Sequence, residues 1–467
     1  MINLRPYQLD LINNIRASMV QGHKNIIACA PTGSGKTVMF SYMVKEASAR
    51  SKRCMILTHR SELLTQAGGT FDKIGVDYAN ITADTKVIPT SKVLICMVET
   101  LKRRVQNRLD FRILIKSIDL LIIDETHLEN FDPIINEFKE DCYIIGFTAT
   151  PLRKSKKPLS DYYSSLVNGP SISSLIQDGY LAKPKYFGVS IDLSKIKIKA
   201  GEFDEKDQEK AFLETKVFEG LKENLEKHAK GLKTMIFCPS VASSEQVAHD
   251  LKCLHVDGTS NDRKKILEQF ENTPGAIISN CAITTVGYDH PAIECIVLYR
   301  ATTSLPLMLQ MCGRGSRVTE SKKNFIILDF GMNIQRHGYW HIDREWSLNL
   351  PKRVKNKKDI FPIKFCPSCG GIVGVNAKVC PECGFIWQKT ETERVFAELQ
   401  ELSYQDIQRR ISEAKSMEEM EQIRIAKGYK IGFLLHRFNK FEQFAEYGRF
   451  KGYNEKWAEI QAKNYLK

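Results

Sequence analysis

The feature that most constrains the fold is a glycine-rich turn that directly follows a short apolar run. Residues 25–29 read NIIAC, residues 30–37 read APTGSGKT, and an amphipathic stretch follows at 38–49. A buried strand, a Gly-rich loop and a helix in this order form a phosphate-binding P-loop. Such loops connect parallel strands that helices cover on both faces. The chain is therefore predicted to contain an α/β lobe.

The P-loop also predicts which groups contact phosphate. Gly33 and Gly35 let the backbone turn its N–H groups toward the phosphates, and the following helix N-terminus adds its positive dipole end. Lys36 is expected to reach the β and γ phosphates, and Thr37 to ligate Mg²⁺. The predicted phosphate-binding residues are Pro31, Thr32, Gly33, Ser34, Gly35, Lys36 and Thr37. Because position 30 is Ala where the strict pattern has Gly, a second motif is needed to support the assignment.

That second motif is LLIIDETH at 120–127, about 90 residues further on. It is an apolar strand that ends in two carboxylates. Asp124 is suited to hold Mg²⁺, and Glu125 to orient and deprotonate an attacking water. A charged turn after a core strand is the alternative interpretation, but the pairing with the P-loop favours a nucleoside triphosphatase.

Short apolar runs recur along the chain in two series. The first series comprises 25–30, 53–58, 93–98, 119–123 and 143–148, and the second comprises 234–238, 275–279, 295–299 and 325–329. Amphipathic stretches separate the runs, which is typical of parallel sheets with crossover helices. We therefore predict two α/β lobes, 1–174 and 175–350. The connection through 179–200 holds turn residues and no strong strand core.

Two CxxC pairs define a separate segment. Cys366 and Cys369 form one pair, and Cys380 and Cys383 the other, with ten residues between the pairs. Four thiolates at this spacing form a closed tetrahedral Zn²⁺ site, which is structural because it has no open position. A disulfide pair is the less favoured alternative. We predict a zinc ribbon at 360–390, whose target could be DNA or a partner protein.

The chain has 467 residues and a net charge of +13, and its composition limits the class of protein to which it can belong. The apolar content of 43% and charged content of 26% predict a folded chain of about three domains. Positive charge is permissive for nucleic-acid binding. The N-terminus has no apolar signal region and no apolar run is long enough to cross a membrane, so no membrane partner and a cytoplasmic location are expected.

The remaining cysteines and the C-terminal region do not require a catalytic or metal-binding role. Nine further cysteines, among them Cys29, Cys54, Cys96 and Cys295, are expected to be buried reduced thiols. The basic run 352–358 is equally compatible with a solvated linker and a phosphate contact. Residues 391–467 are predicted to be helical, and their aromatic side chains are expected to pack a small helical core rather than to stack on bases.

These motifs resemble those of the superfamily-two DEAD/H-type helicases over residues 1–345. The resemblance implies two RecA-like lobes in tandem, followed here by the zinc ribbon and a helical C-terminal region. It implies that Arg5 and Gln8 of the RPYQ segment bind adenine, so that the nucleotide is ATP. It also implies nucleic-acid contacts by His59, Arg60 and Thr100.

The resemblance continues through the motifs that join hydrolysis to movement. It implies that His127, Thr148, Thr150 and Gln310 couple the two events. In the second lobe, Thr284 would contact nucleic acid, and Gly287 and Asp289 would contact the nucleotide. The segment QMCGRGSR at 310–317 would supply two arginine fingers, Arg314 and Arg317. A guanidinium from the opposite lobe stabilises charge on the γ-phosphate, so hydrolysis would require lobe closure.

Within the superfamily, the RPYQ start, the QMCGRGSR segment and the Cys-rich segment are most similar to bacterial RadD and to phage branch-migration helicases. The commonest form of the DETH motif carries Ala where this chain has Thr126, and we expect no loss of activity from this change. The resemblance implies an ATP-dependent DNA helicase or translocase that remodels forked or branched DNA in repair or recombination, in a bacterial or phage-infected cell.

Two other functions stay open. The chain could be a DNA-stimulated ATPase that mainly binds forked, branched or single-stranded DNA and recruits single-strand-binding or recombination proteins. An RNA helicase is disfavoured because the motifs resemble the RPYQ group rather than the DEAD-box RNA group. A nuclease activity within this chain is not expected, since no paired acidic and lysine pattern accompanies the motor motifs.

Overall fold

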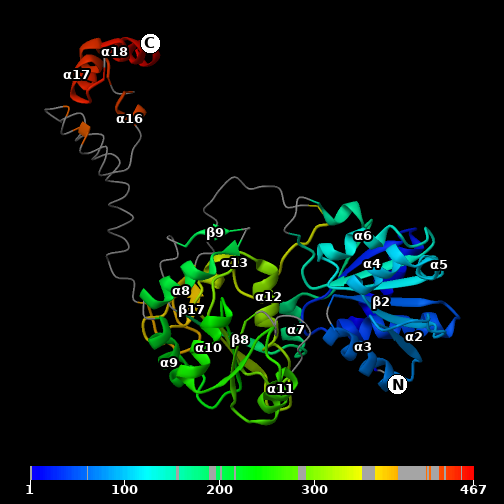
Figure 1. Cartoon of the computed structure of the whole chain (residues 1–467). Coiled ribbons are helices and arrows are strands. Elements are labelled where there is room, and N and C mark those ends of the chain that lie inside the picture. Colours follow the sequence, from blue (N-terminus) through cyan, green and yellow to red (C-terminus); the bar gives the residue numbers. More distant parts are fainter. Residues whose placement is uncertain are drawn as a thin grey trace. The chain divides into compact units, whose positions relative to one another are not determined.

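The computed structural model describes most of the chain. The described residues are 3–59, 61–153, 157–188, 196–199, 202–214, 217–281, 291–349, 363–387, 417, 420–421, 431–435, 438–453 and 455–466. They fall into two compact units, residues 1–385 and 386–467. The first unit contains two α/β lobes and the four-cysteine segment (Figure 1).

The first lobe is built on a seven-stranded sheet in the order β3-β4-β2-β5-β6-β1-β7. Every neighbouring pair of strands is parallel. The strands are β1 (Asn25–Cys29), β2 (Cys54–Thr58), β3 (Tyr78–Ile81), β4 (Val93–Met97), β5 (Leu120–Asp124), β6 (Tyr143–Thr148) and β7 (Ser165–Asn168). The helices are α1 (Pro6–Val20), α2 (Lys36–Ala49), α3 (Ser61–Ile74), α4 (Val98–Asn107), α5 (Leu109–Lys116) and α6 (Asp132–Ile135).

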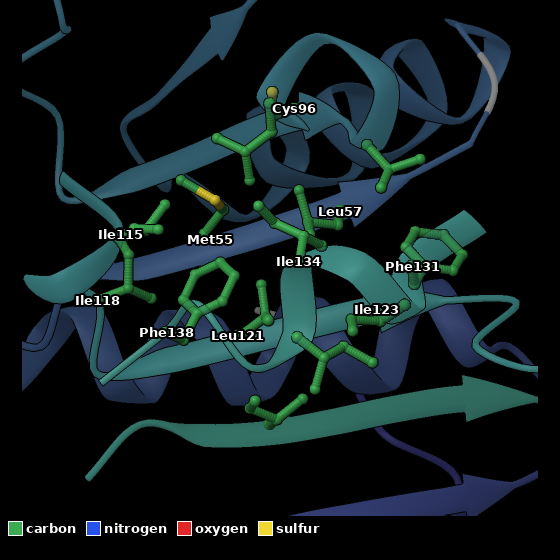
Figure 2. Close-up of a cluster of buried hydrophobic side chains, with 14 of the residues drawn as sticks. Met55, Leu57, Cys96, Ile115, Ile118, Leu121, Ile123, Phe131, Ile134 and Phe138 are labelled. Carbon is green, nitrogen blue, oxygen red and sulfur yellow. The ribbon is translucent and has the colours of Figure 1, made fainter. Parts of the chain in front are cut away.

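Alternate residues of these strands pack into two hydrophobic cores, one on each face of the sheet. Leu121 and Ile123 of β5 join a core with α4, α5 and α6, part of which Figure 2 shows. Leu120 and Ile122 of the same strand join the opposite core with α1, α2 and α3. Because side chains of a strand point alternately to its two faces, a strand covered on both faces is apolar throughout. This explains why the strands were readable as continuous apolar runs.

The second lobe repeats this scheme with six parallel strands in the order β12-β13-β11-β14-β15-β8. The strands are β8 (Lys183–Gly188), β11 (Thr234–Phe237), β12 (Leu254–Val256), β13 (Ile277–Asn280), β14 (Cys295–Leu298) and β15 (Asn324–Asp329). The helices are α8 (Glu205–Glu214), α9 (Val217–His228), α10 (Val241–Leu251), α11 (Arg263–Asn272), α12 (Leu305–Gly313) and α13 (Asn333–His337). Helix α7 (Ile172–Gln177) lies between the two sheets in the sequence, and the short strands β9 (Ile198–Lys199) and β10 (Glu202–Phe203) form an antiparallel pair.

One expectation about the connection between the lobes is wrong. The segment with Pro184 and Gly188, predicted to lack a strand, is β8 and pairs with β15 along its whole length. Since β8 is the edge strand of its sheet, its Pro residue costs no internal ladder bond. The turn residues are real, as Gly179 has a φ of +74°, but they precede the strand.

The four-cysteine segment covers the outer edge of β8. It contains an antiparallel pair, β16 (Ile363–Phe365) and β17 (Ile372–Gly374). Gly371 forms a bridge with Phe187, and the Gly188 N–H donates to the Gly370 carbonyl at 3.1 Å. Ile372 is buried in the core of the second lobe. The segment is therefore packed into this lobe.

The second unit contains a small helical core. Its described helices are α16 (Gly432–Leu435), α17 (Phe441–Phe450) and α18 (Glu455–Tyr465). Phe438, Phe444 and Tyr447 are buried at its centre, as expected for packing aromatics. Tyr447 donates to the buried Glu421 at 2.7 Å, and Lys451 pairs with the same carboxylate at 2.9 Å.

Two expectations about the chain as a whole can be compared with the structure. The nine cysteines outside the two CxxC pairs are all free, and seven of them, among them Cys29, Cys54, Cys96 and Cys295, are buried as predicted. The expectation is wrong for Cys253 and Cys281, which are only half-buried. Among the described helices, none combines the length and the apolar character needed to span a bilayer.

Candidate nucleotide site between two lobes

The predicted nucleotide residues of the first lobe meet at one edge of its sheet. Strands β5, β6 and β1 are adjacent and parallel, so their carboxyl ends lie side by side. The P-loop follows β1, Asp124 ends β5, and Thr148 ends β6. Ligand sites of such sheets form beyond the carboxyl ends of the strands. Three motifs far apart in the sequence thus reach a single place.

The P-loop has the backbone that its glycines predict. Gly33 and Gly35 have φ values of +87° and +83°. The positive φ of Gly35 favours glycine, and a β-carbon there would also lie 2.5 Å from the Gln8 side-chain nitrogen. Among the described residues, no side chain caps the N-terminus of α2, which leaves its N–H groups available to an anion. The Lys36 ammonium donates to the Ala30 carbonyl at 3.4 Å.

The two carboxylates of the DETH segment are buried and electrostatically distinct. Burial, with the neighbouring Glu125 charge, raises the pKa of Asp124. Burial also acts on Glu125, but the charges of Lys36 and His127 outweigh it and leave the Glu125 pKa lowered. Glu125 also has a φ of +53°, a strained value that tends to occur at functional sites. The basic groups around Glu125 therefore favour its charged form in a buried position.

The residues predicted to couple hydrolysis to movement form a connected set. His127 Nδ1 lies 2.9 Å from the Thr148 hydroxyl and 3.3 Å from a Glu125 carboxylate oxygen. The Thr150 N–H donates to the same Thr148 hydroxyl at 3.0 Å. His127 also lines a cleft of about 590 Å³ together with Gln310 of the second lobe. The carboxylate is thereby connected through His127 to the end of β6, and Gln310 of the second lobe lines the same cleft.

Thr126, the departure from the commonest motif, has its own packing partners. Its hydroxyl forms a hydrogen bond with Tyr163, and both side chains are buried. A β-carbon on Gly146 of β6 would lie 2.6 to 2.7 Å from the Thr126 side chain. The larger residue therefore fits because the facing strand position is glycine and because a tyrosine satisfies the hydroxyl.

The RPYQ segment contacts the P-loop directly. Gln8 and Tyr7 both donate to the Ser34 carbonyl at 2.9 Å. Arg5 lies 4.9 Å from the ring centre of Tyr180, and that ring makes an edge contact with Tyr7 at 4.9 Å. Tyr7 and Tyr180 were not predicted site residues. Tyr7 stood within the motif, whereas no local pattern marked Tyr180, which approaches only in the folded chain.

The second lobe approaches the P-loop through the QMCGRGSR segment. A β-carbon on Gly313 would lie 2.7 Å from Thr32, and one on Gly33 would lie 3.1 Å from Ser316. Arg314 is buried, and its charge contributes to the lowered pKa of Glu125. Arg317 forms a backbone bridge with Leu181. The turn that carries Arg314 therefore packs against the P-loop of the first lobe.

The structure describes only some of the residues that are predicted to contact nucleic acid. His59 follows β2 and lies close enough to Glu125 to contribute to its lowered pKa, which places it beside the candidate nucleotide site. Thr100 is half-buried in α4. Several predicted residues lie outside the described part of the chain: Arg60, Thr284, Gly287, Asp289 and the basic run 352–358.

The four cysteines converge as a metal site requires. Their sulfur atoms all lie within 4.8 Å of one another, and the Cys366–Cys383 and Cys369–Cys380 pairs are each 3.7 Å apart. A tetrahedral Zn²⁺ site with Zn–S bonds of about 2.3 Å has sulfur atoms about 3.8 Å apart. The cysteines are free thiols rather than the alternative disulfide. The donor set therefore fits a closed zinc site.

Comparisons with known proteins agree with this geometry. The family model "Type III restriction enzyme, res subunit" matches residues 1–153, and "Helicase conserved C-terminal domain" matches residues 216–319. A 51.5 kDa protein of Lactococcus phage (isolate 7-9) is 30% identical over 435 residues, which cover 88% of this chain and 92% of the phage protein. IRC3 of Saccharomyces cerevisiae, named as an ATP-dependent helicase, is 33% identical over 70% of this chain and 51% of the yeast protein.

Among solved structures, a fragment of an HsdR subunit of a type I restriction enzyme from Vibrio vulnificus YJ016 has a TM-score of 0.58 at 25% identity. The match covers 72% of this chain and 67% of that one. Fold and site together define a P-loop nucleoside triphosphatase with two RecA-like lobes. The chain belongs to the superfamily-two DEAD/H-type helicases, a family of ATP-hydrolysing helicases and translocases.

Proposed function

We propose that this protein is an ATP-dependent DNA helicase or translocase that remodels forked or branched DNA during repair or recombination. One observation carries the proposal: the candidate site is divided between the lobes. Glu125 belongs to the first lobe, whereas Arg314 belongs to a turn of the second lobe whose Gly313 packs against Thr32 of the P-loop. Chemistry that needs both lobes requires them to close, and closure and opening can move a bound strand.

In the proposed reaction, the N–H groups around Gly33 and Gly35 bind the phosphates, and Lys36 pairs with their charge. Thr37 and Asp124 would hold Mg²⁺, which neutralises phosphate charge when bound. Glu125 orients the attacking water and takes its proton. Arg314 stabilises the charge that develops on the transferred phosphoryl group, and Arg317 assists from the adjacent turn.

The proposed link between hydrolysis and movement consists of His127, Thr148, Thr150 and Gln310. Loss of the γ-phosphate changes the charge next to Glu125, and His127 touches both this carboxylate and Thr148. Gln310 faces the same cleft from the second lobe. We propose that this connection transmits the state of the nucleotide to Thr150 and to the relative position of the lobes.

The choice of DNA rests on the net charge of +13 and on the likeness of the motifs to the RPYQ group, which includes bacterial RadD and phage branch-migration helicases. His59, Arg60, Thr100 and Thr284 are the proposed nucleic-acid contacts. Single-strand-binding and recombination proteins are the proposed partners, in the cytoplasm of a bacterial or phage-infected cell. The phage relative supports that setting.

We further propose that Cys366, Cys369, Cys380 and Cys383 bind one structural Zn²⁺. The sulfur spacing supports this assignment. A bound ion would join the second CxxC pair to the first, and the first pair is followed by Gly370 and Gly371, which contact the edge of β8. The proposed role of the ion is to order this segment on the second lobe.

Forked DNA separates the proposed function from its alternatives. We expect ATP turnover to rise with DNA, a labelled fork to be converted in ATP, and Lys36→Ala to abolish both activities. DNA-stimulated turnover without conversion of any fork or junction would favour the recruitment function. Preferential displacement of an RNA duplex would favour the RNA helicase. Normal hydrolysis by Lys36→Ala would refute the motor assignment.

A further inference from the structure

A buried lysine outside all of the motifs contacts the arginine turn of the second lobe. Lys322 precedes β15 and is only 5% exposed. Its ammonium donates to the carbonyls of Pro291, Ile293 and Gly315 at 2.7, 2.6 and 3.0 Å. An ammonium has three N–H donors and no acceptor, so three converging carbonyls match its full capacity.

These carbonyls belong to two segments, the arginine turn and the residues that lead into β14. Gly315 directly follows Arg314, whereas Pro291 and Ile293 lead into β14 at the centre of the sheet. Lys322 therefore ties the arginine turn to the sheet. Its removal would leave buried carbonyls without this donor, which the protein would relieve by moving the turn.

The rest of the turn is already held closely against its neighbours. The Ala182 N–H donates to the Ser316 carbonyl at 2.7 Å, and the Ser316 hydroxyl donates to the Gly313 carbonyl at 2.8 Å. A β-carbon on Gly315 would lie 2.4 Å from the Phe325 ring. A turn held on several sides can place a guanidinium accurately, and the hydrogen bond from Lys322 to the Gly315 carbonyl is part of that support.

We propose that Lys322 is a positioning residue for ATP hydrolysis, which acts by holding the turn that presents Arg314 to the nucleotide. The inference rests on the proposed role of Arg314 as an arginine finger. Because Lys322 touches only backbone carbonyls in these contacts, its substitution should alter the geometry of the transition state rather than the binding of ATP.

The chain offers a matched control in a second buried lysine. Lys233 is also 5% exposed and donates to the carbonyls of Phe270 and Glu271 at 2.6 and 2.8 Å. It ties the end of α11 to the start of β11 and, among the described residues, forms no hydrogen bond with the arginine turn. Loss of Lys233 should therefore destabilise the same lobe without moving Arg314.

The test compares Lys322→Met with Lys233→Met in the full chain, with kcat, KM and the thermal midpoint measured for each. Both variants should melt earlier than wild type. Lys322→Met should lose about 10- to 100-fold in kcat with KM within about twofold, as a misplacement of about 1 Å predicts. Lys233→Met should keep both constants. Wild-type kcat in Lys322→Met, or equal kcat losses in both variants, would overturn the proposal.

If Lys322→Met does not fold, Lys322→Arg decides the question. Its planar fork cannot converge on three carbonyls as an ammonium does, so kcat should fall while KM stays near wild type. An unchanged kcat would overturn the proposal. Arg314→Ala, assayed in parallel, separates the two claims. Full activity in Arg314→Ala would remove the proposed function, whereas loss there with full activity in both Lys322 variants would remove only this inference.

Discussion

The two lobes share one architecture but differ at the carboxyl ends of their strands. In the first lobe, α2 follows β1 through Gly35 and has no side-chain cap among the described residues. In the second lobe, α10 follows β11 through Ser240, whose hydroxyl accepts from the Ser243 N–H and caps the helix. One helix N-terminus is open to an anion, and the other is satisfied by its own chain.

In both lobes the sheet positions the loops, whereas the loops decide the chemistry. In the proposed reaction, the first lobe provides phosphate binding and the carboxylates. The second would provide the arginines that follow α12. Neither set is complete alone, so hydrolysis should fail when either lobe loses its part. The predictions below test this division of labour.

The largest effect should follow removal of the arginine of the second lobe. We expect Arg314→Ala to lower kcat by about 10³- to 10⁵-fold, because the γ-phosphate charge loses its guanidinium in the transition state. Steady-state hydrolysis and binding of a fluorescent ATP analogue measure the effect. Arg314→Lys should recover part of the rate, since it keeps the charge but loses the planar fork. Normal turnover in Arg314→Ala would assign all of the chemistry to the first lobe.

The next effect should come from the carboxylate of the first lobe. Glu125→Gln should lower kcat by about 10²- to 10⁴-fold, because the amide cannot take a proton from water. ATP binding should persist, since Lys36 and the loop N–H groups remain. Glu137→Gln changes an exposed carboxylate of the same lobe and should leave the rate unchanged. Equal rates for both variants would exclude Glu125 as the base.

Metal removal should affect stability of the second lobe more than chemistry. Cys380→Ser should lose bound zinc and about 2–3 kcal/mol of stability, which lowers the thermal midpoint by about 5–10 °C. Metal analysis and calorimetry provide the readouts. Cys253→Ser, a free cysteine outside the cluster, should keep the metal. Unchanged zinc content in Cys380→Ser would disprove the four-cysteine site.

The smallest effect concerns the packing of the DETH segment. Gly146→Ala should cost about 1–3 kcal/mol, because the added methyl group meets Thr126. Thr126→Ala removes that clash and should rescue the double variant relative to Gly146→Ala alone. Urea unfolding of the four proteins measures the coupling. Strictly additive losses would show that the two side chains do not constrain each other.

Much of this site was predictable because its motifs lie at strand ends. Lys36, Asp124 and Glu125 each follow an apolar run, and parallel pairing brings those runs together. Tyr180 and Lys322 were not predictable, since their contacts arise only from tertiary proximity. Strand β8 was not predicted because Pro184 is typical of turns. Pro184 is tolerated there because β8 is the edge strand of its sheet, and the cysteine segment covers that edge.

The central claim, that ATP is hydrolysed jointly by the two lobes, is tested most directly by single-turnover hydrolysis in the Glu125→Gln and Arg314→Ala variants and their combination. Groups that act as a unit on one transition state give non-additive losses. We predict that the double variant hydrolyses ATP at about the rate of the slower single variant. A double variant whose loss equals the product of the two single losses would show that the lobes act independently, and would contradict the account.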